Sequence, residues 1–546
     1  MMTKPLVRYS QKSVLIIEDF TEFARSLRGM MINMGSKKID MVYCGEDAIQ
    51  VCKEQKYDII LSDYNLGDGK DGQQVLEELH TFDLLKTNTM FVMVTAENTT
   101  EMVMGALEFQ PDSYLTKPFN GHILKSRLDK GIYKKDILAP IAKLIRKKKW
   151  QLALDLCDET IEEHPKFRMA CLRHKFLCLK RLKQYDKALE LTTGIVNERP
   201  IPWAMLGVGE VFFAKQELER ASDLFSDMIN EFPMVLEAYD WQAKIQHLLG
   251  QPIEAQNTLI KAVQYSPKAL KRQKSLGGLA EENNDFEIMS GAFRQAIKYG
   301  SNSAFASPDE FVKLTKSIGN QIKGNADVDK KKLINEVENV FKKLDNRFKE
   351  DPSTQFRSAV AHADFGSITN DEKTVEKYLT AANKFYEKID SHIDANQSIE
   401  ISESLKKLGQ SELAESILEE AVEQHFDDPD FIKKAEKITS NKNLILNSKK
   451  TNQLNNKAIH LFSSGDFAGA IEYFKKATKI AGNNINIHLN HAQALLKRYQ
   501  TEEKKAQYLE EAQQTLSEIN RLSANDPRYE RYSELSRLTQ LMLQNQ

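Results

Sequence analysis

Cysteine is scarce in this chain, with five residues among 546, and none stands in a C-x-x-C pair or at the cysteine–histidine spacing of a metal site. This usage excludes a disulfide scaffold and is typical of a reducing compartment. Long apolar runs are also missing: there is no stretch of about 18 apolar residues, and the first residues lack the apolar segment of a secretory signal. We therefore expect a cytosolic protein that does not contact membranes.

An excess of charge of one sign is the second absence. The chain has 76 basic and 78 acidic residues, so no bulk electrostatic attraction to nucleic acid or to a membrane surface is expected. Beyond the first domain we find no DNA-reading motif, phosphate-binding loop, nucleophile elbow or zinc-binding helix. Because 546 residues exceed what one core normally serves, we expect two or more domains.

The N-terminal part of the chain alternates apolar runs with helical segments. Ile59, Ile60 and Leu61 form an uninterrupted apolar run, as in a strand that is covered on both faces of a parallel sheet. We expect five strands in this region, at residues 13–17, 39–42, 58–63, 90–94 and 113–118. Strands that alternate with helices predict a doubly wound α/β domain with right-handed crossovers.

A polar side chain stands at the end of four of these strands. The four residues are Asp19, Asp63, Thr95 and Lys117. Because the carboxyl ends of parallel strands meet at one edge of a sheet, we expect these side chains to converge there. Any one of them alone has an ordinary explanation, since an aspartate or threonine after a strand is more often a cap or turn residue. Their combination, in order, points to chemistry.

This constellation resembles the receiver domain of bacterial response regulators. The family's acid pair corresponds to Glu18-Asp19, its phosphoacceptor to Asp63, its switch hydroxyl to Thr95 and its lysine to Lys117; the aromatic switch position corresponds to Tyr114, which alone would suit a core aromatic. The resemblance implies a flavodoxin-like five-stranded sheet of order 2-1-3-4-5. Two departures are the Glu-Asp pair in place of Asp-Asp and a loop at residues 66–72 that is one residue longer than usual.

The resemblance also implies a chemistry. Asp63 would be the nucleophile that forms an aspartyl phosphate. Magnesium would be the cofactor, held by Asp19, Asp63 and the Asn65 carbonyl, with Glu18 behind a water. Lys117 would neutralise phosphoryl charge, and Lys117-Pro118 would be a cis peptide. Asn65 and Glu97 would tune dephosphorylation, since similar residues occur in fast-cycling chemotaxis regulators. We expect no enzymatic activity beyond the receiver's own phosphorylation and dephosphorylation.

The C-terminal region repeats with a period near 34 residues. One small or apolar position recurs at intervals of 35, 33, 34 and 34 residues, a bulkier side chain follows four residues later, and a proline ends four of the units. The recurring position is occupied by Ala153, Ala188, Ala221, Ala255 and Met289. The pattern resembles tetratricopeptide (TPR) repeats and predicts an all-α solenoid. Degraded copies follow around Ala414, Ala470 and Ala512.

We therefore divide the chain into five segments. They are a receiver domain at residues 1–134, a helical linker at 135–149 with Pro140 at the joint between domains, TPR repeats at 150–305, an irregular helical region at 306–394, and degenerate TPR-like repeats with C-terminal helices at 395–546. Cys171 and Cys178 lie seven residues apart on one expected helical face, which favours packing over a metal site.

These features predict a two-component response regulator. A sensor histidine kinase or phosphotransfer protein would phosphorylate Asp63. Thr95 and Tyr114, with the face formed by the fifth strand and the helices on either side of it, would transmit the change to the repeats. The repeats would bind a protein or peptide, although they could also space or dimerise the receiver. Two alternatives remain open: a TPR-based phosphatase that acts on another regulator, and a scaffold or phosphate sink whose receiver drives no output.

Overall fold

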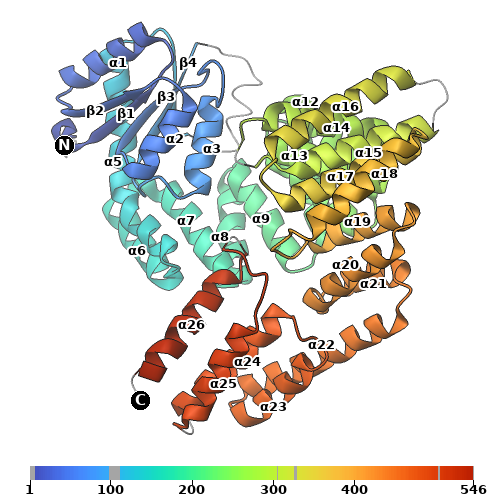
Figure 1. The fold of residues 1–546 in the computed structure, drawn as a ribbon. Helices are drawn as coiled ribbons and strands as arrows, with labels where there is room; N and C mark the ends of the chain where they lie inside the picture. The colour runs from blue at the N-terminus through green and yellow to red at the C-terminus, as the bar shows by residue number, and fades with distance from the viewer. Residues whose placement is uncertain are drawn as a thin grey trace. The chain divides into compact units, whose positions relative to one another are not determined.

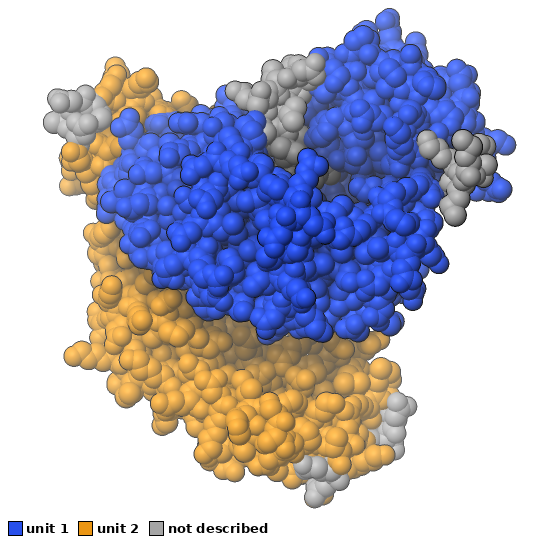
Figure 2. All heavy atoms as spheres, turned by 180° about the vertical axis from the view of Figure 1, so that it is seen from behind, with its two compact units in different colours: residues 1–317 blue, residues 318–546 orange. Residues whose placement is uncertain are grey.

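The computed structural model describes residues 7–96, 111–303, 305–324, 329–501, 504–524 and 526–544. The chain forms two compact units, residues 1–317 and 318–546 (Figure 2). The first unit contains an α/β domain and a helical array, and the described part of the second unit is helical (Figure 1). The predicted fold class, a flavodoxin-like domain followed by an α-helical TPR-type solenoid, is confirmed.

Five parallel strands form the sheet of the first unit, in the order β2-β1-β3-β4-β5. The strands are β1 (Ser13–Ile17), β2 (Lys38–Val42), β3 (Ile59–Asp63), β4 (Met90–Thr95) and β5 (Ser113–Thr116). One face is covered by α1 (Thr21–Asn33) and α5 (Gly121–Arg146), and the other by α2 (Gly45–Glu54) and α3 (Gly72–Thr81) (Figure 1). Both faces of the central strands β1, β3 and β4 are buried, which explains why these strands are almost entirely apolar; the edge strand β2 is only partly buried.

The register of the strands brings their carboxyl ends level. Ile17 pairs with Ser62, Asp63 with Val94, and Thr95 with Thr116. The residues that follow β1, end β3 and β4, and follow β5 therefore lie at one edge of the sheet, as predicted.

Helix α5 connects the sheet to the helical array without a break. Its first half packs on the sheet through Leu124 and Leu128, whereas Leu138 and Ile141 belong to the apolar core that it shares with α6 (Trp150–Glu163) and α7 (Arg168–Arg181). Pro140 lies inside this helix, which continues through it; that Pro140 marks the joint between the domains stays a prediction. Packing of the flanking apolar residues offsets the hydrogen bond that proline cannot donate.

The helices after α7 confirm the small-residue pattern. They are α8 (Tyr185–Glu198), α9 (Pro202–Ala214), α10 (Leu218–Glu231), α11 (Leu236–Leu248), α12 (Pro252–Tyr265), α13 (Leu270–Glu282), α14 (Phe286–Gly300) and α15 (Pro308–Gly324). All five recurring positions are fully buried, from Ala153 to Met289. A Cβ atom on Gly209 would lie 2.3 Å from the Phe225 ring, and one on Gly277 would lie 2.6 Å from the Phe293 ring. The Phe225 and Phe293 rings therefore occupy space that is open only because the preceding helix has glycine there.

The second unit continues with helices over the segments that we expected to be irregular or degenerate. They are α16 (Lys330–Arg347), α17 (Pro352–Ile368), α18 (Glu372–Tyr386), α19 (Ala395–Lys407), α20 (Ser411–Gln424), α21 (Pro429–Ile438), α22 (Lys442–Ser463), α23 (Phe467–Thr478), α24 (Ile485–Thr501), α25 (Ala506–Ser517) and α26 (Tyr529–Gln544). Ala414, Ala470 and Ala512 are fully buried. Within the described ranges of both units, no helix is long and apolar enough to cross a membrane.

Candidate functional site

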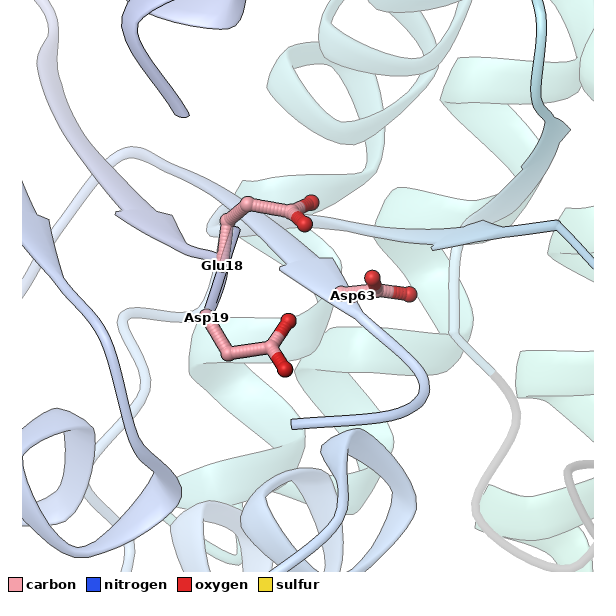
Figure 3. Close-up of side chains that lie close together, drawn as sticks. All are labelled: Glu18, Asp19 and Asp63. Atoms are coloured by element: carbon pink, nitrogen blue, oxygen red, sulfur yellow. The ribbon is translucent and has the colours of Figure 1, made fainter. Parts of the chain in front are cut away.

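Three carboxylates converge at the edge of the sheet where the strands end. Glu18 and Asp19 follow β1, and Asp63 ends β3 (Figure 3). One carboxylate oxygen from each residue lies within 4.8 Å of those of the other two. Glu18 is fully buried and Asp63 is 8% exposed, whereas Asp19 faces solvent. An ion could therefore reach the cluster from the side of Asp19.

The lysine that follows β5 reaches into this cluster. The Nζ atom of Lys117 donates to Asp63 Oδ2 at 2.7 Å and to the two Glu18 carboxylate oxygens at 2.9 and 3.1 Å. It also lies 4.2 Å from the centroid of the Phe23 ring. The Lys117–Pro118 peptide is cis, as expected, and the Lys117 amide donates to the Thr95 carbonyl at 2.7 Å.

Burial and charge shift the protonation equilibria of the cluster. Burial raises the pKa of Glu18 to about 7; the nearby Asp63 charge adds to this increase, and the hydrogen bonds from Lys117 oppose it. Burial alone would lower the pKa of Lys117, but its bonds to Asp63 and Glu18 outweigh burial and raise it. Three carboxylates thus face one ammonium group, and the excess of negative charge favours a cation.

The donor set fits a hard divalent cation such as magnesium, which prefers carboxylate and carbonyl oxygens and keeps several waters. Asp19 and Asp63 provide carboxylates that solvent or an ion can reach, and buried Glu18 is held by Lys117. The backbone amide of Asn65 donates to Asp63 Oδ1 at 3.4 Å, and Asn65 Oδ1 accepts from the backbone amide of Gly67 at 3.3 Å. These two bonds hold Asn65 within the loop that follows Asp63.

The two residues predicted to form a switch, Thr95 and Tyr114, occupy neighbouring strands. Thr95 ends β4 beside Asp63's strand and is 9% exposed. Tyr114 lies on β5 with its ring packed against the core that α2 and α3 cover, and its hydroxyl has no hydrogen-bond partner among the described residues. Burial raises the pKa of the Tyr114 hydroxyl. Glu97, the other expected tuning residue, lies outside the described residues.

The loop between β3 and α3 is shaped by glycine. Gly67 and Gly69 have φ angles of 74° and 102°, which L side chains rarely adopt. A Cβ atom on Gly72 would lie 2.1 Å from the carbonyl oxygen of Asp63, so only glycine fits this close approach. Asp71 then begins α3 with a reciprocal capping box. Sequence reasoning missed the role of Gly72, although the glycine-rich run after Asp63 was visible.

The same loop and α3 contact residues 299–303 of the first unit, which are the end of α14 and the turn that follows it. Lys70 Nζ donates to the Asn302 carbonyl at 2.5 Å, and Asn302 Nδ2 donates to the Gly69 carbonyl at 2.6 Å. Gln74 Nε2 donates to the Tyr299 carbonyl at 3.0 Å. A further hydrogen bond, 3.2 Å long, joins Ser303 Oγ to Glu77 Oε2. These four bonds, here called the loop–turn contact, link the receiver to the repeats.

We predicted transmission through the face formed by β5, α5 and the residues before β5, but the residues before β5, 97–110, lie outside the described residues. Helix α5 joins the repeats covalently, and the described hydrogen bonds between the domains include those from the loop after Asp63. The longer loop thus has a structural role that the sequence left unexplained.

Comparison with known proteins assigns both regions. Residues 14–129 match the response regulator receiver domain family, and residues 454–484 match a tetratricopeptide repeat family. The chemotaxis protein CheY-3 of Vibrio cholerae is 27% identical over 117 residues, which cover 21% of this chain and 88% of that protein. The chemotaxis protein CheY of Pseudomonas aeruginosa is 25% identical over 117 residues, which cover 21% of this chain and 93% of that protein.

Among solved structures, a two-component response regulator from Clostridium difficile is 29% identical, with 22% of this chain and 96% of that chain covered and a TM-score of 0.21. The sequence matches and the geometry of the strand ends agree on the N-terminal region. The chain therefore carries an N-terminal response regulator receiver domain, followed by a helical region that contains a tetratricopeptide repeat.

Proposed function

We propose that this protein is a two-component response regulator whose Asp63 accepts a phosphoryl group and whose output is protein binding by the repeats. The donor is a sensor histidine kinase or a phosphotransfer protein, and magnesium is the cofactor. The observation that carries the proposal is the position of Asp63 at 2.7 Å from Lys117, within a cluster of three carboxylates. The five cysteines, all unpaired, suit the cytosolic location that such a regulator has.

The reaction requires little covalent work from the protein. An Asp63 carboxylate oxygen attacks the phosphorus of a phosphohistidine, the phosphorus–nitrogen bond breaks, and a mixed anhydride forms. Magnesium held by Asp19 and Asp63 would supply positive charge for the phosphoryl oxygens. Lys117 adds its ammonium group beside Asp63, and Glu18 and Phe23 fix its direction. Hydrolysis by water later restores the carboxylate.

The loop–turn contact supports control of the repeats by the receiver. Its receiver side, Gly69 to Glu77, follows Asp63 directly in the chain, through a loop in which Gly67 and Gly69 have positive φ angles. Phosphorylation adds a charged group at the base of this loop. We infer that the added group changes the loop conformation and thereby the strength of the contact with residues 299–303.

Intact-mass and phosphate-affinity electrophoresis measurements test the phosphorylation. The full chain is incubated with acetyl phosphate and magnesium, or with a phosphohistidine donor, and should gain one phosphoryl group that chelation of magnesium prevents. Asp63→Asn should abolish the gain. Asp68→Asn is the matched control, since Asp68 is exposed on the same loop and outside the acidic cluster. Phosphorylation of Asp63→Asn at the wild-type level would refute the proposal.

A further inference from the structure

The second unit contains a polar cavity of about 600 Å³. It is bordered by α20, by the start of α22 and by the turns that follow α23 and α25. The lining is rich in two kinds of side chain, carboxylates from α20 and amides from α22 and the two turns. Such a cavity suits a ligand that brings positive charge and hydrogen-bonding groups.

The carboxylates come from Glu419, Glu420 and Glu423. Arg521 Nη1 donates to both carboxylate oxygens of Glu420, at 3.0 and 2.9 Å. Glu420 Oε1 also lies 2.7 Å from His392 Nδ1. Arg521 is the only Lys or Arg among the residues that line the cavity. The lining thus has three carboxylates and one guanidinium group, which is an excess of negative charge among these groups.

Two buried polar atoms beside the cavity lack partners among the described residues. Thr451 is 1% exposed, and its Oγ1 atom has no hydrogen bond. The His392 side chain is 8% exposed, and its Nε2 atom also has none. If His392 donates to Glu420 through Nδ1, its Nε2 atom is an acceptor that needs a donor. Buried polar groups are rarely left without partners, because each such atom costs about 1–3 kcal/mol.

Three polar side chains of α22 have a spacing that fits an extended peptide chain. Asn443, Asn447 and Thr451 follow one another at intervals of four residues and all line the cavity. An interval of four residues rises about 6 Å along a helix. Alternate residues of an extended peptide are about 6.6 Å apart. One strand of peptide could therefore meet a polar side chain of α22 at every second residue.

We propose that this cavity binds an extended peptide segment that carries a lysine or arginine side chain. The cationic side chain lies against the carboxylates of Glu419 and Glu423, and the peptide backbone pairs with Asn443 and Asn447. A donor from the peptide reaches His392 Nε2, and Thr451 Oγ1 gains a partner. This inference rests on the proposed protein-binding output of the repeats and names the chemistry of the partner.

The test uses the full chain and an array of immobilised short peptides, graded in net charge from strongly acidic to strongly basic. Retained peptides should be enriched in lysine and arginine, and their binding should weaken as salt is added. A double variant, Glu419→Gln with Glu423→Gln, should bind them at least about tenfold more weakly. Glu412→Gln is the matched control, since Glu412 is exposed on α20 but does not line the cavity.

A second variant keeps the test informative if the first one disturbs folding. Asn443→Ala with Asn447→Ala changes only exposed side chains of α22 and should weaken binding of basic peptides without altering the thermal unfolding of the chain. Retention of no peptides, retention without a basic preference, or equal binding by both double variants and wild type would each overturn the inference. Phosphorylation of Asp63 is measured on the same preparation, so a failure here is distinguishable from a failure of the proposed function.

Discussion

The loop–turn contact offers a sharp test of communication between the receiver and the repeats. Asn302→Ala removes the side-chain amide that donates to the Gly69 carbonyl at 2.6 Å, and leaves the backbone carbonyl that accepts from Lys70. One neutral hydrogen bond contributes about 1 kcal/mol. The equilibrium for opening the contact should therefore rise about fivefold.

Asn302 is a better target than Lys70 for this purpose. Lys70 also pairs with Glu78 at 3.0 Å, and the Glu78 side chain is only 11% exposed. Substitution of Lys70 would therefore leave the Glu78 carboxylate poorly hydrated inside the receiver. The loss of this ion pair could not be separated from the loss of the bond to Asn302. Asn302, in contrast, lies on the repeat side, so its substitution leaves the cluster of Glu18, Asp19 and Asp63 intact.

Hydrogen–deuterium exchange followed by mass spectrometry measures the opening. Peptides that cover residues 66–74 and 297–303 should exchange faster in Asn302→Ala than in wild type, whereas peptides from the sheet core should not change. Ser301→Ala is the matched control, because the Ser301 hydroxyl bonds only within its own helix end, to the Lys298 carbonyl at 3.2 Å. Equal exchange in Asn302→Ala and Ser301→Ala would show that the contact does not hold the loop.

Three further predictions concern packing and protonation. Gly72→Ala should slow phosphorylation and lower the melting temperature, since its Cβ atom would lie 2.1 Å from the Asp63 carbonyl oxygen; phosphorylation at the wild-type rate would contradict this. Phe225→Ala should cost about 3–5 kcal/mol, because Phe225 is fully buried; exchange of the α10 amides reports the loss, and unchanged protection would count against it. Burial and the nearby Lys475 charge lower the pKa of His491 to about 4, so its neutral form stabilises the fold above about pH 6.5 and this stabilisation is lost as the pH falls through 4. Protection of α24 should drop by roughly 2 kcal/mol from about pH 7 to about pH 5; an equal drop in His491→Gln would refute this cause.

The sheet and the repeats could be predicted because both leave local signals. Strands that are buried on two faces are apolar throughout, and residues such as Asp63 and Lys117 stand directly after them. The small residue that lets two helices approach, such as Ala221, recurs at the period of the helix pair. The convergence of Asp19 and Asp63 could be predicted because the carboxyl ends of parallel strands meet at one edge of the sheet.

Other features depend on contacts between residues that are far apart in the sequence. Proline disrupts helices locally, but α5 continues through Pro140, and Leu138 and Ile141 beside it pack in the core of the helical array. The contact between Lys70 and Asn302 joins residues 232 positions apart, and no periodicity in the sequence indicates it. The cavity beside Thr451 is likewise formed by several helices and turns, none of which is unusual alone.

The central claim is that the phosphorylation state of Asp63 controls the repeats through the loop–turn contact. Hydrogen–deuterium exchange of residues 297–303 tests it most directly, in wild type and Asp63→Asn, each with and without acetyl phosphate and magnesium. The account predicts that phosphorylation changes the exchange of this turn in wild type and leaves it unchanged in Asp63→Asn. Identical exchange of the turn in phosphorylated and unphosphorylated wild type would contradict it.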